Sequence, residues 1–280
     1  MDSSNVTNVT YAASTCSHTF WQNTAPLITT YAVCAIGFML NFIELVIFYR
    51  KRNELSTNDT VLISLSLADL VYVLITSITI TLYVRNIKVA HGYFYDSLIS
   101  FAIFNSVFHL LLMSTDRLIA IRKPLWHHVN VSKKKLTILC LAIWLLTAVL
   151  IISVGFRKKA LLHTIMLSNH TSMLNKRDAL NIDIHLTVSL VLLVCIVFLL
   201  IYPYILLKII KGNKNICRVQ SRNWKLAKTS GLICASFILV NAPLAIGYLI
   251  RLCNTDKWLY IVQMTNCFLN SLIYFWMRYR

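Results

Sequence analysis

Seven stretches of this sequence are long and apolar enough to cross a lipid bilayer. A transmembrane helix needs about 20 predominantly apolar residues, and a backbone surrounded by hydrocarbon must satisfy its hydrogen bonds within its own segment, as a helix does. Only 13% of the 280 residues are charged, whereas 58% are hydrophobic. We therefore predict an all-α membrane protein, a seven-transmembrane helix bundle with spans at residues 27–49, 61–84, 94–121, 135–156, 182–210, 229–250 and 258–277.

The distribution of Lys and Arg predicts the orientation of the bundle, because cytoplasmic loops carry an excess of these residues. With the N-terminus extracellular, about two-thirds of the 27 Lys and Arg residues face the cytoplasm. We expect a multi-pass protein of the plasma membrane with an extracellular tail (1–26), a membrane domain (27–277) and a short cytoplasmic end (278–280). Basic loops beside anionic membrane lipid explain most of the net charge of +17, so no nucleic acid partner is needed.

The tail supports the same orientation. Residues 1–26 contain no Lys or Arg and no signal peptide, and they hold two glycosylation motifs. On this topology three motifs are extracellular, and we expect them to be glycosylated: Asn5, Asn8 and Asn169. Two others, at Asn58 and Asn130, fall on the cytoplasmic side, where we expect them to be unused.

Most of the eight cysteines lie within spans, where they pack as small apolar residues. Cys16 and Cys253 are the two on the extracellular side. They either form a disulfide that ties the tail to the loop between the sixth and seventh spans, or remain two free thiols.

Four polar residues stand out inside the predicted spans: Glu44, Asp69, Asn266 and Asn270. A charge at this depth costs several kcal/mol on most scales, so such residues are candidates for function. The amides have a simpler interpretation as hydrogen bonds between helices. Asp69 does not, because a buried carboxylate must be protonated, paired or bound to a cation.

The chain resembles the class A, rhodopsin-like family of G-protein-coupled receptors over nearly its whole length. The resemblance rests on one motif per span, in the family's order: Asn41, Asp69 in "LADL", Asp116 and Arg117 in "DRL", Trp144, Tyr204, Phe237 with Pro243, and "NSLIY" from Asn270 to Tyr274.

The resemblance implies that Arg117 is the activation switch and that Asp116 holds it at rest. Arg117 would then meet a heterotrimeric G protein as the sixth helix moves outward. By the same resemblance Tyr204, Tyr274 and Leu125 serve G-protein coupling, and the helix-core switch consists of Phe237, Asn241 and Pro243. A simpler interpretation of Arg117 is an interfacial anchor of the third span.

The resemblance also implies a sodium ion bound by Asp69, Ser106, Asn266 and Asn270, a set of oxygen donors that suits a hard cation. We expect no other cofactor.

Several positions depart from the family pattern. Asn241 replaces a tryptophan, and Asn223 provides no acid to hold Arg117, so we expect weak restraint at rest and some basal signalling. Glu44 replaces a small apolar residue, for which the sequence offers no explanation. Gly92 replaces the cysteine of the usual extracellular disulfide, which therefore cannot form.

The candidates for the ligand pocket are Asp96, Ile99, Ser100 and Met264. By resemblance, Met264 in place of a lysine argues against retinal, and Ile99 in place of an aspartate argues against the usual amine anchor, although Asp96 lies one turn further out. The excess of extracellular cations slightly favours an acidic ligand. We expect an extracellular peptide or small molecule whose identity the sequence does not give.

One alternative is a seven-helix transporter or ion pathway that uses Asp69 and Glu44. Against it, the sequence has no repeated half and only 6 glycines and 4 prolines. Enzymatic chemistry has no support, and His109 is expected to be a bonded residue between helices rather than a metal ligand.

Overall fold

The computed structural model describes residues 24–85, 93–167, 182–211, 218–249 and 256–279. The regular elements of these residues are all helical: α2 (Thr24–Arg50), α3 (Thr57–Val84), α4 (Tyr93–Arg122), α5 (Pro124–Asn130), α6 (Lys133–Leu167), α8 (Ile182–Lys211), α9 (Arg218–Leu249), α10 (Asp256–Met264) and α11 (Asn266–Tyr279). The all-α prediction is confirmed, and the helix bounds extend several of the predicted spans.

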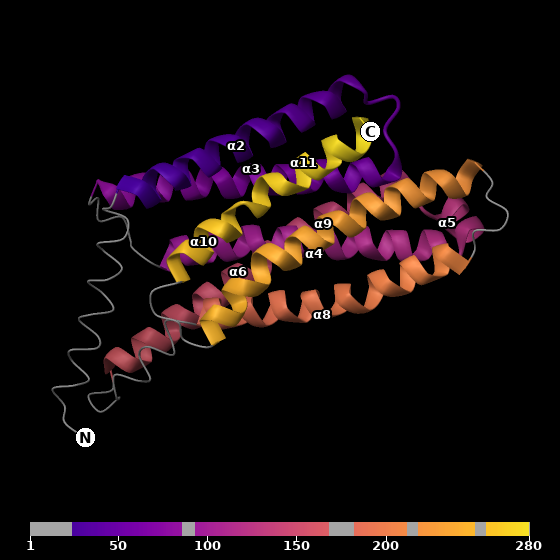
Figure 1. The fold of residues 1–280 in the computed structure, drawn as a ribbon. Coiled ribbons are helices and arrows are strands. Elements are labelled where there is room, and N and C mark those ends of the chain that lie inside the picture. Colours follow the sequence, from indigo (N-terminus) through magenta and orange to yellow (C-terminus); the bar gives the residue numbers. More distant parts are fainter. Residues whose placement is uncertain (1–23, 86–92, 168–181, 212–217, 250–255, 280) are drawn as a thin grey trace.

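The long helices run side by side as a bundle, with α4 at its centre (Figure 1). Helix α4 contacts α3, α6, α8 and α9, while α2 packs against α3 and against α10 and α11. Contacts of α8 with α9, and of α9 with α10 and α11, complete the ring.

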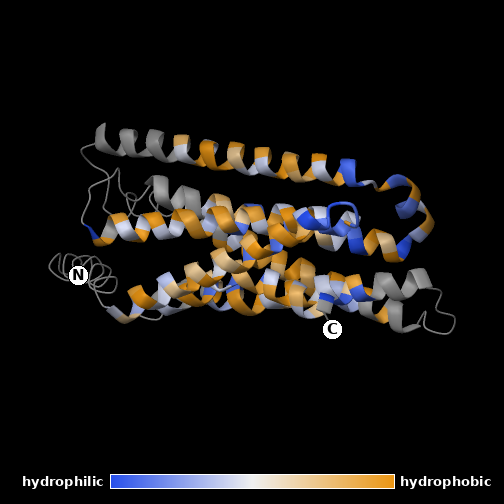
Figure 2. Ribbon diagram, turned by 90° about the horizontal axis from the view of Figure 1, so that it is seen from above, coloured by the Kyte–Doolittle hydropathy of each residue, from blue (hydrophilic) through white to orange (hydrophobic). Residues whose placement is uncertain are grey.

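Apolar side chains cover much of the outside of the bundle. Leu145 and Leu200 are each 69% exposed, as expected of residues that face lipid rather than water. Figure 2 shows long hydrophobic runs along the helices, with hydrophilic residues gathered toward the end where the C-terminus lies. Among the described residues, α2, α3, α6, α8 and α9 are long and apolar enough to span a membrane.

The other two predicted spans correspond to α4 and to the pair α10 and α11. Helix α4 carries Asp116, Arg117 and Arg122 near its end. The seventh span is broken at Thr265, whose backbone N–H and side-chain hydroxyl both donate to the carbonyl oxygen of Val262, at 3.0 and 2.6 Å. Because this three-residue turn interrupts the α-helical hydrogen bonds, α11 starts as a separate helix.

Two local features shape the end of the bundle that we assign to the cytoplasm. Ser56 and Asp59 cap the start of α3 reciprocally: the Ser56 N–H donates to Asp59 Oδ2 at 2.7 Å, and the Asp59 N–H donates to Ser56 Oγ at 3.3 Å. Directly after α4, Pro124 starts the short helix α5, which the sequence prediction did not include. Helix α5 packs against α4.

Candidate functional site

Asp116 and Arg117 form an ion pair near the C-terminal end of α4. Arg117 Nε donates to Asp116 Oδ2 at 3.0 Å, and Nη2 contacts the same oxygen. The residues are 6% and 2% exposed, so solvent screens the pair little. Removing one partner of a buried ion pair costs about 3–5 kcal/mol, because the other charge is left uncompensated.

A third residue joins this pair from α5. His127 Nε2 lies 2.7 Å from Asp116 Oδ1, so Asp116 holds Arg117 with one oxygen and His127 with the other. The sequence prediction missed His127, because eleven residues separate it from Asp116 and only the turn into α5 brings the two together. Asp116 thus links the end of α4 to the following helix.

The same short helix presents an apolar surface to the outside. Leu125, Trp126 and Val129 are 83%, 51% and 81% exposed. They belong to α5, which lies at one end of the bundle (Figure 1). Exposed apolar residues grouped at one site mark an interaction surface more often than isolated ones do.

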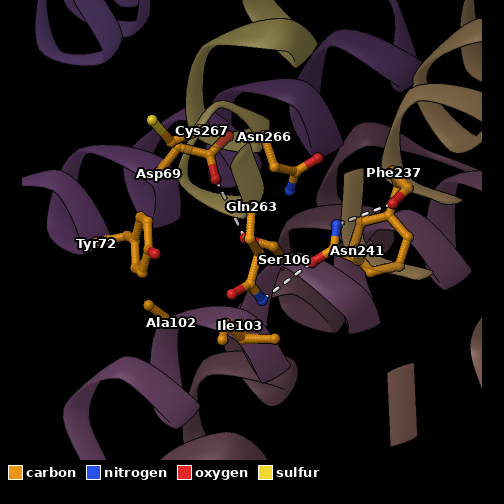
Figure 3. A pocket seen from close by; sticks show the side chains of 10 residues that line it. All are labelled: Asp69, Tyr72, Ala102, Ile103, Ser106, Phe237, Asn241, Gln263, Asn266 and Cys267. Carbon is orange, nitrogen blue, oxygen red and sulfur yellow. Dashed lines mark hydrogen bonds between the residues drawn. The ribbon is translucent and has the colours of Figure 1, made fainter. Parts of the chain in front are cut away.

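Asp69 lies in a polar cluster in the middle of the bundle. Ser106 Oγ donates to Asp69 Oδ1 at 3.1 Å, and Asn270 Nδ2 donates to Oδ2 at 3.0 Å. A cavity of about 20 Å³ adjoins Asp69 and Ser106 and is also lined by Asn266 (Figure 3). Among the described residues, the amide oxygens of Asn266 and Asn270 are buried without a hydrogen-bond partner.

Asp69, Ser106 and Asn266 line a space that fits a small cation, and Asn270 bonds to Asp69 beside it. A cavity of this size holds about one water-sized particle, and a hard cation takes carboxylate, hydroxyl and amide oxygens as ligands. The two unpartnered amide oxygens are acceptors that lack a donor, and a cation can satisfy such oxygens. The residues predicted from sequence are thus brought together.

The predicted helix-core switch residues of α9 lie on two sides of the helix. Phe237 is buried and packs edge-to-face against Phe198 of α8, with ring centroids 6.1 Å apart. Asn241 is also buried, and it accepts a hydrogen bond of 3.1 Å from Gln263 Nε2 of α10 (Figure 3). Pro243 is exposed on the outside of the same helix. The sequence prediction missed Gln263, which is the partner of Asn241.

Glu44 has a partner that the sequence did not indicate. Its carboxyl group is 1% exposed and contacts Ser271 Oγ of α11. Ser271 also lies 2.9 Å from Asn41 Oδ1. Helices α2 and α11 are thereby joined through three polar side chains in the interior of the bundle.

Two tyrosines near the end of α8 face different surroundings. Tyr204, the residue named by the sequence prediction, is 40% exposed, and Arg122 lies over its ring at 5.3 Å. Tyr202 instead reaches the interior, where its hydroxyl lies 3.2 Å from Ser114 Oγ and 3.4 Å from Cys234 Sγ. Tyr202 therefore connects α8 to α4 and α9. The sequence prediction named Tyr204 and missed Tyr202.

Tyr274 of α11 is buried between aromatic and cationic neighbours. Its ring lies 5.1 Å from that of Phe48 and beneath Arg278 at 5.4 Å. Its hydroxyl has no hydrogen-bond partner among the described residues. An unsatisfied buried hydroxyl costs about 1–3 kcal/mol, so this arrangement favours any state in which the hydroxyl finds a partner.

His109 is a bonded residue between helices, as predicted. Trp144 Nε1 of α6 donates to Ser64 Oγ of α3 at 3.0 Å, and Ser64 lies 2.6 Å from His109 Nε2. His109 Nδ1 lies 2.7 Å from the carbonyl oxygen of Asn105. A neutral imidazole satisfies every one of these contacts, with Nδ1 as donor and Nε2 as acceptor.

The remaining predicted residues are only partly described. Ser100 and Met264 are buried, and Met264 packs with Val33 and Tyr72 in a core cluster between α2 and α3. Asp96 and Ile99 lie on α4, but their side chains are not described. The predicted disulfide cysteines and glycosylation sites lie outside the described residues: Cys16, Cys253, Asn5, Asn8 and Asn169.

A comparison with known families matches most of the chain. Residues 40–274 match the family described as 7 transmembrane receptor (rhodopsin family). No curated protein is significantly similar to the chain. The matched residues include the Asp69 cluster, the Asp116–Arg117 pair and Tyr274.

Proposed function

Since the chain belongs to the rhodopsin family of seven-transmembrane receptors, we propose that the Asp116–Arg117 pair is its activation switch. The chain is therefore a seven-transmembrane bundle and a multi-pass plasma-membrane receptor that signals through heterotrimeric G proteins. Membership decides against the alternative of a transporter or ion pathway built on Asp69 and Glu44. Members of this family are receptors, not enzymes.

The observation that carries the switch proposal is the buried pairing at the end of α4. Arg117 is held by Asp116, which His127 of α5 also contacts. When two packings of a helix bundle differ in free energy by only a few kcal/mol, a change in the partners of a buried charge shifts the equilibrium between them. On activation, Arg117 leaves Asp116 and turns toward the G protein as α9 moves outward.

Leu125 supplies the apolar contact to the G protein. It is largely exposed on α5, next to Trp126 and Val129. Because α5 also carries His127, contact of a G protein with the exposed side of α5 acts on the Asp116 carboxylate. Tyr274 contributes from α11, where its unpartnered hydroxyl is free to bond in the active packing.

A sodium ion stabilises the resting packing through Asp69, Ser106, Asn266 and Asn270. The cavity beside Asp69 and the two unpartnered amide oxygens support this assignment. The ion supplies positive charge against Asp69 and ties α3 and α4 to α11. Asn241 of α9 and Gln263 of α10, which are bonded to each other, line the same cavity.

The ligand is an extracellular peptide or small molecule. Ser100 and Met264 are buried residues of the half of the bundle nearer the extracellular end, on α4 and α10. The excess of cations among the extracellular segments supports an acidic group on the ligand.

The switch is tested by ligand-free G-protein activation in cells that express the wild type or Arg117→Ala at matched surface levels. We expect basal signal from the wild type and its loss in the variant. Lys134→Ala, an exposed cation at the start of α6, is the control and should signal like the wild type. Equal signal from wild type and Arg117→Ala would exclude Arg117 as the switch.

The sodium site is tested in purified receptor by thermal unfolding in sodium, potassium or choline chloride at equal ionic strength. We expect sodium alone to raise the unfolding temperature of the wild type, and Asp69→Asn to abolish this difference. A wild type that unfolds at the same temperature in all three salts has no such site.

A further inference from the structure

Glu44 and Ser271 are two departures from the family pattern that contact each other. Glu44 stands on α2 where the family has a small apolar residue, and Ser271 stands on α11 where the family motif has a proline. Glu44 is 1% exposed and Ser271 is fully buried. A carboxyl group and a hydroxyl thus meet in the buried interface between α2 and α11.

The orientation of the Asn41 side chain is fixed by two carbonyl groups. Asn41 Nδ2 donates to the carbonyl oxygens of Gly37, at 2.8 Å, and Cys267, at 2.5 Å. Reversing the amide would place its oxygen against both carbonyl oxygens. Asn41 Oδ1 therefore points at Ser271 and can only accept a hydrogen bond.

The Ser271 hydroxyl is within donating distance of two oxygens, Asn41 Oδ1 at 2.9 Å and Glu44 Oε2, but it has only one proton. We assign the proton of Ser271 to the bond with Asn41 Oδ1, which can only accept. The contact of Ser271 with Glu44 Oε2 then needs a donor on the Glu44 side. Ser66 of α3, whose hydroxyl also lies beside the Glu44 carboxyl, donates to the carbonyl oxygen of Leu62 at 3.0 Å. The proton in the Glu44–Ser271 contact therefore belongs to Glu44.

We propose that Glu44 is a proton-binding site of this receptor, occupied in the resting packing, where it donates through Ser271 to Asn41 and ties α2 to α11. Asp69 contrasts with it, since both Asp69 oxygens accept hydrogen bonds, from Ser106 and Asn270. Asp69 is satisfied as a carboxylate, and Glu44 is satisfied as a carboxylic acid. The two buried acids thus have different roles, cation binding and proton binding.

The surroundings of Glu44 are consistent with a neutral acid. The charged groups that act on it from neighbouring helices are Asp59 and Asp69 of α3 and Arg278 of α11. On its own helix, the nearest charged residue in sequence is Arg50 at the end of α2. Within the described residues no ion pair joins Glu44 to a cation, so an ionised Glu44 would be a buried charge without a direct partner.

Proton binding at Glu44 is coupled to the distance between α2 and α11. When α11 moves away from α2, the acid loses the acceptor that holds its proton, and water that enters the gap stabilises the carboxylate. Protonation therefore favours the resting packing. Lower pH is expected to decrease ligand-free signalling, and higher pH to increase it.

The proton is measured directly by infrared spectroscopy of purified wild-type receptor and of Glu44→Gln, Asp69→Asn and Ser271→Ala. We expect a carbonyl band of a protonated carboxylic acid that shifts on transfer to D2O. The band should disappear in Glu44→Gln, persist in Asp69→Asn and change frequency in Ser271→Ala. Absence of the band from the wild type, or its survival in Glu44→Gln, would overturn the proposal whether or not the receptor signals.

A second measurement, which rests on the proposed function, compares ligand-free signalling with pH in membranes of the wild type and Glu44→Gln. The Gln amide keeps a donor toward Ser271, so this variant should fold, reach the surface and signal without the wild-type dependence on pH. Ser271→Ala should raise the basal signal. If Glu44→Gln kept the full pH dependence of the wild type, the coupling of Glu44 protonation to signalling would be contradicted. If neither the wild type nor Glu44→Gln signalled, only the proposal that Asp116 and Arg117 form the switch would be contradicted.

Discussion

His127 is the residue through which α5 acts on the switch. Its Nε2 is 2.7 Å from Asp116 Oδ1, in a partly buried contact. The Asp116 carboxylate therefore has two partners, and the loss of either changes its hold on Arg117.

We expect His127→Ala to raise ligand-free signalling about tenfold, because a hydrogen bond to a charged group contributes about 1.5–3 kcal/mol. His128→Ala changes the exposed neighbour on the same helix and should leave the signal unchanged. G-protein activation at matched surface expression measures both. A His127→Ala receptor with wild-type basal signal would show that the contact of α5 with Asp116 does not affect the hold of Asp116 on Arg117.

Tyr274 and Tyr202 provide a matched pair of hydroxyl deletions. The Tyr274 hydroxyl is buried without a partner among the described residues, whereas the Tyr202 hydroxyl contacts Ser114 and Cys234. Removing an unsatisfied polar group relieves a cost, while removing a bonded one forfeits about 1 kcal/mol.

Tyr274→Phe should therefore unfold at the same temperature as the wild type or higher, and Tyr202→Phe at a lower one, in thermal denaturation of purified receptor. Tyr274→Phe should also signal less, since the active packing loses its hydroxyl. Destabilisation by Tyr274→Phe would mean that the hydroxyl is already bonded at rest.

At the scale of the elements, α2 comes close to its neighbours at Gly37. A Cβ placed there would meet Cys267 Sγ at 2.7 Å and Val73 Cγ2 at 3.1 Å. Glycine thus lets α2 approach α11 and α3, and this approach positions Asn41 for its bond to the Cys267 carbonyl.

Gly37→Ala should destabilise the receptor by about 1–3 kcal/mol through overpacking. Gly155→Ala on α6, where nothing lies within 4 Å of an added Cβ, should be neutral or stabilising by up to about 1 kcal/mol. Thermal unfolding of the two purified variants provides the comparison. Equal stability of the two would show that α2 can shift away without cost.

For the whole molecule, the orientation in the membrane determines which motifs meet the glycosylation machinery. Asn58 is buried in α3, and Asn130 donates to the carbonyl oxygen of Trp126 within α5. Both are engaged in folded structure at the end that we assign to the cytoplasm.

We expect Asn→Gln changes at Asn5, Asn8 and Asn169 each to remove one glycan, seen as a stepwise gain in gel mobility of the receptor. The same change at Asn58 or Asn130 should leave mobility unaltered. A change in gel mobility on substitution of Asn58 or Asn130 would show that the predicted orientation in the membrane is wrong.

The polar residues of the spans could be predicted from sequence, but their partners could not. Asp69, Ser106 and Asn270, which the resemblance assigned to one sodium site, lie in one hydrogen-bonded cluster, and the site itself stays a prediction. Gln263 and His127 were missed because nothing in their local sequence distinguishes them from other polar residues near helix ends. Tyr202 was missed because Tyr202 and Tyr204, two residues apart, differ only in the side of α8 that they face.

The sequence alone determined the number of spans, their order and their expected orientation, because hydrocarbon requires long apolar runs and tolerates few charges, and both are one-dimensional properties. The tertiary structure decided which side chains meet. The contacts of Asp116 with His127, Asn241 with Gln263 and Glu44 with Ser271 depend on the turn after α4 and on the rotation and packing of each helix. These quantities arise from contacts between distant segments, so only the folded bundle specifies them.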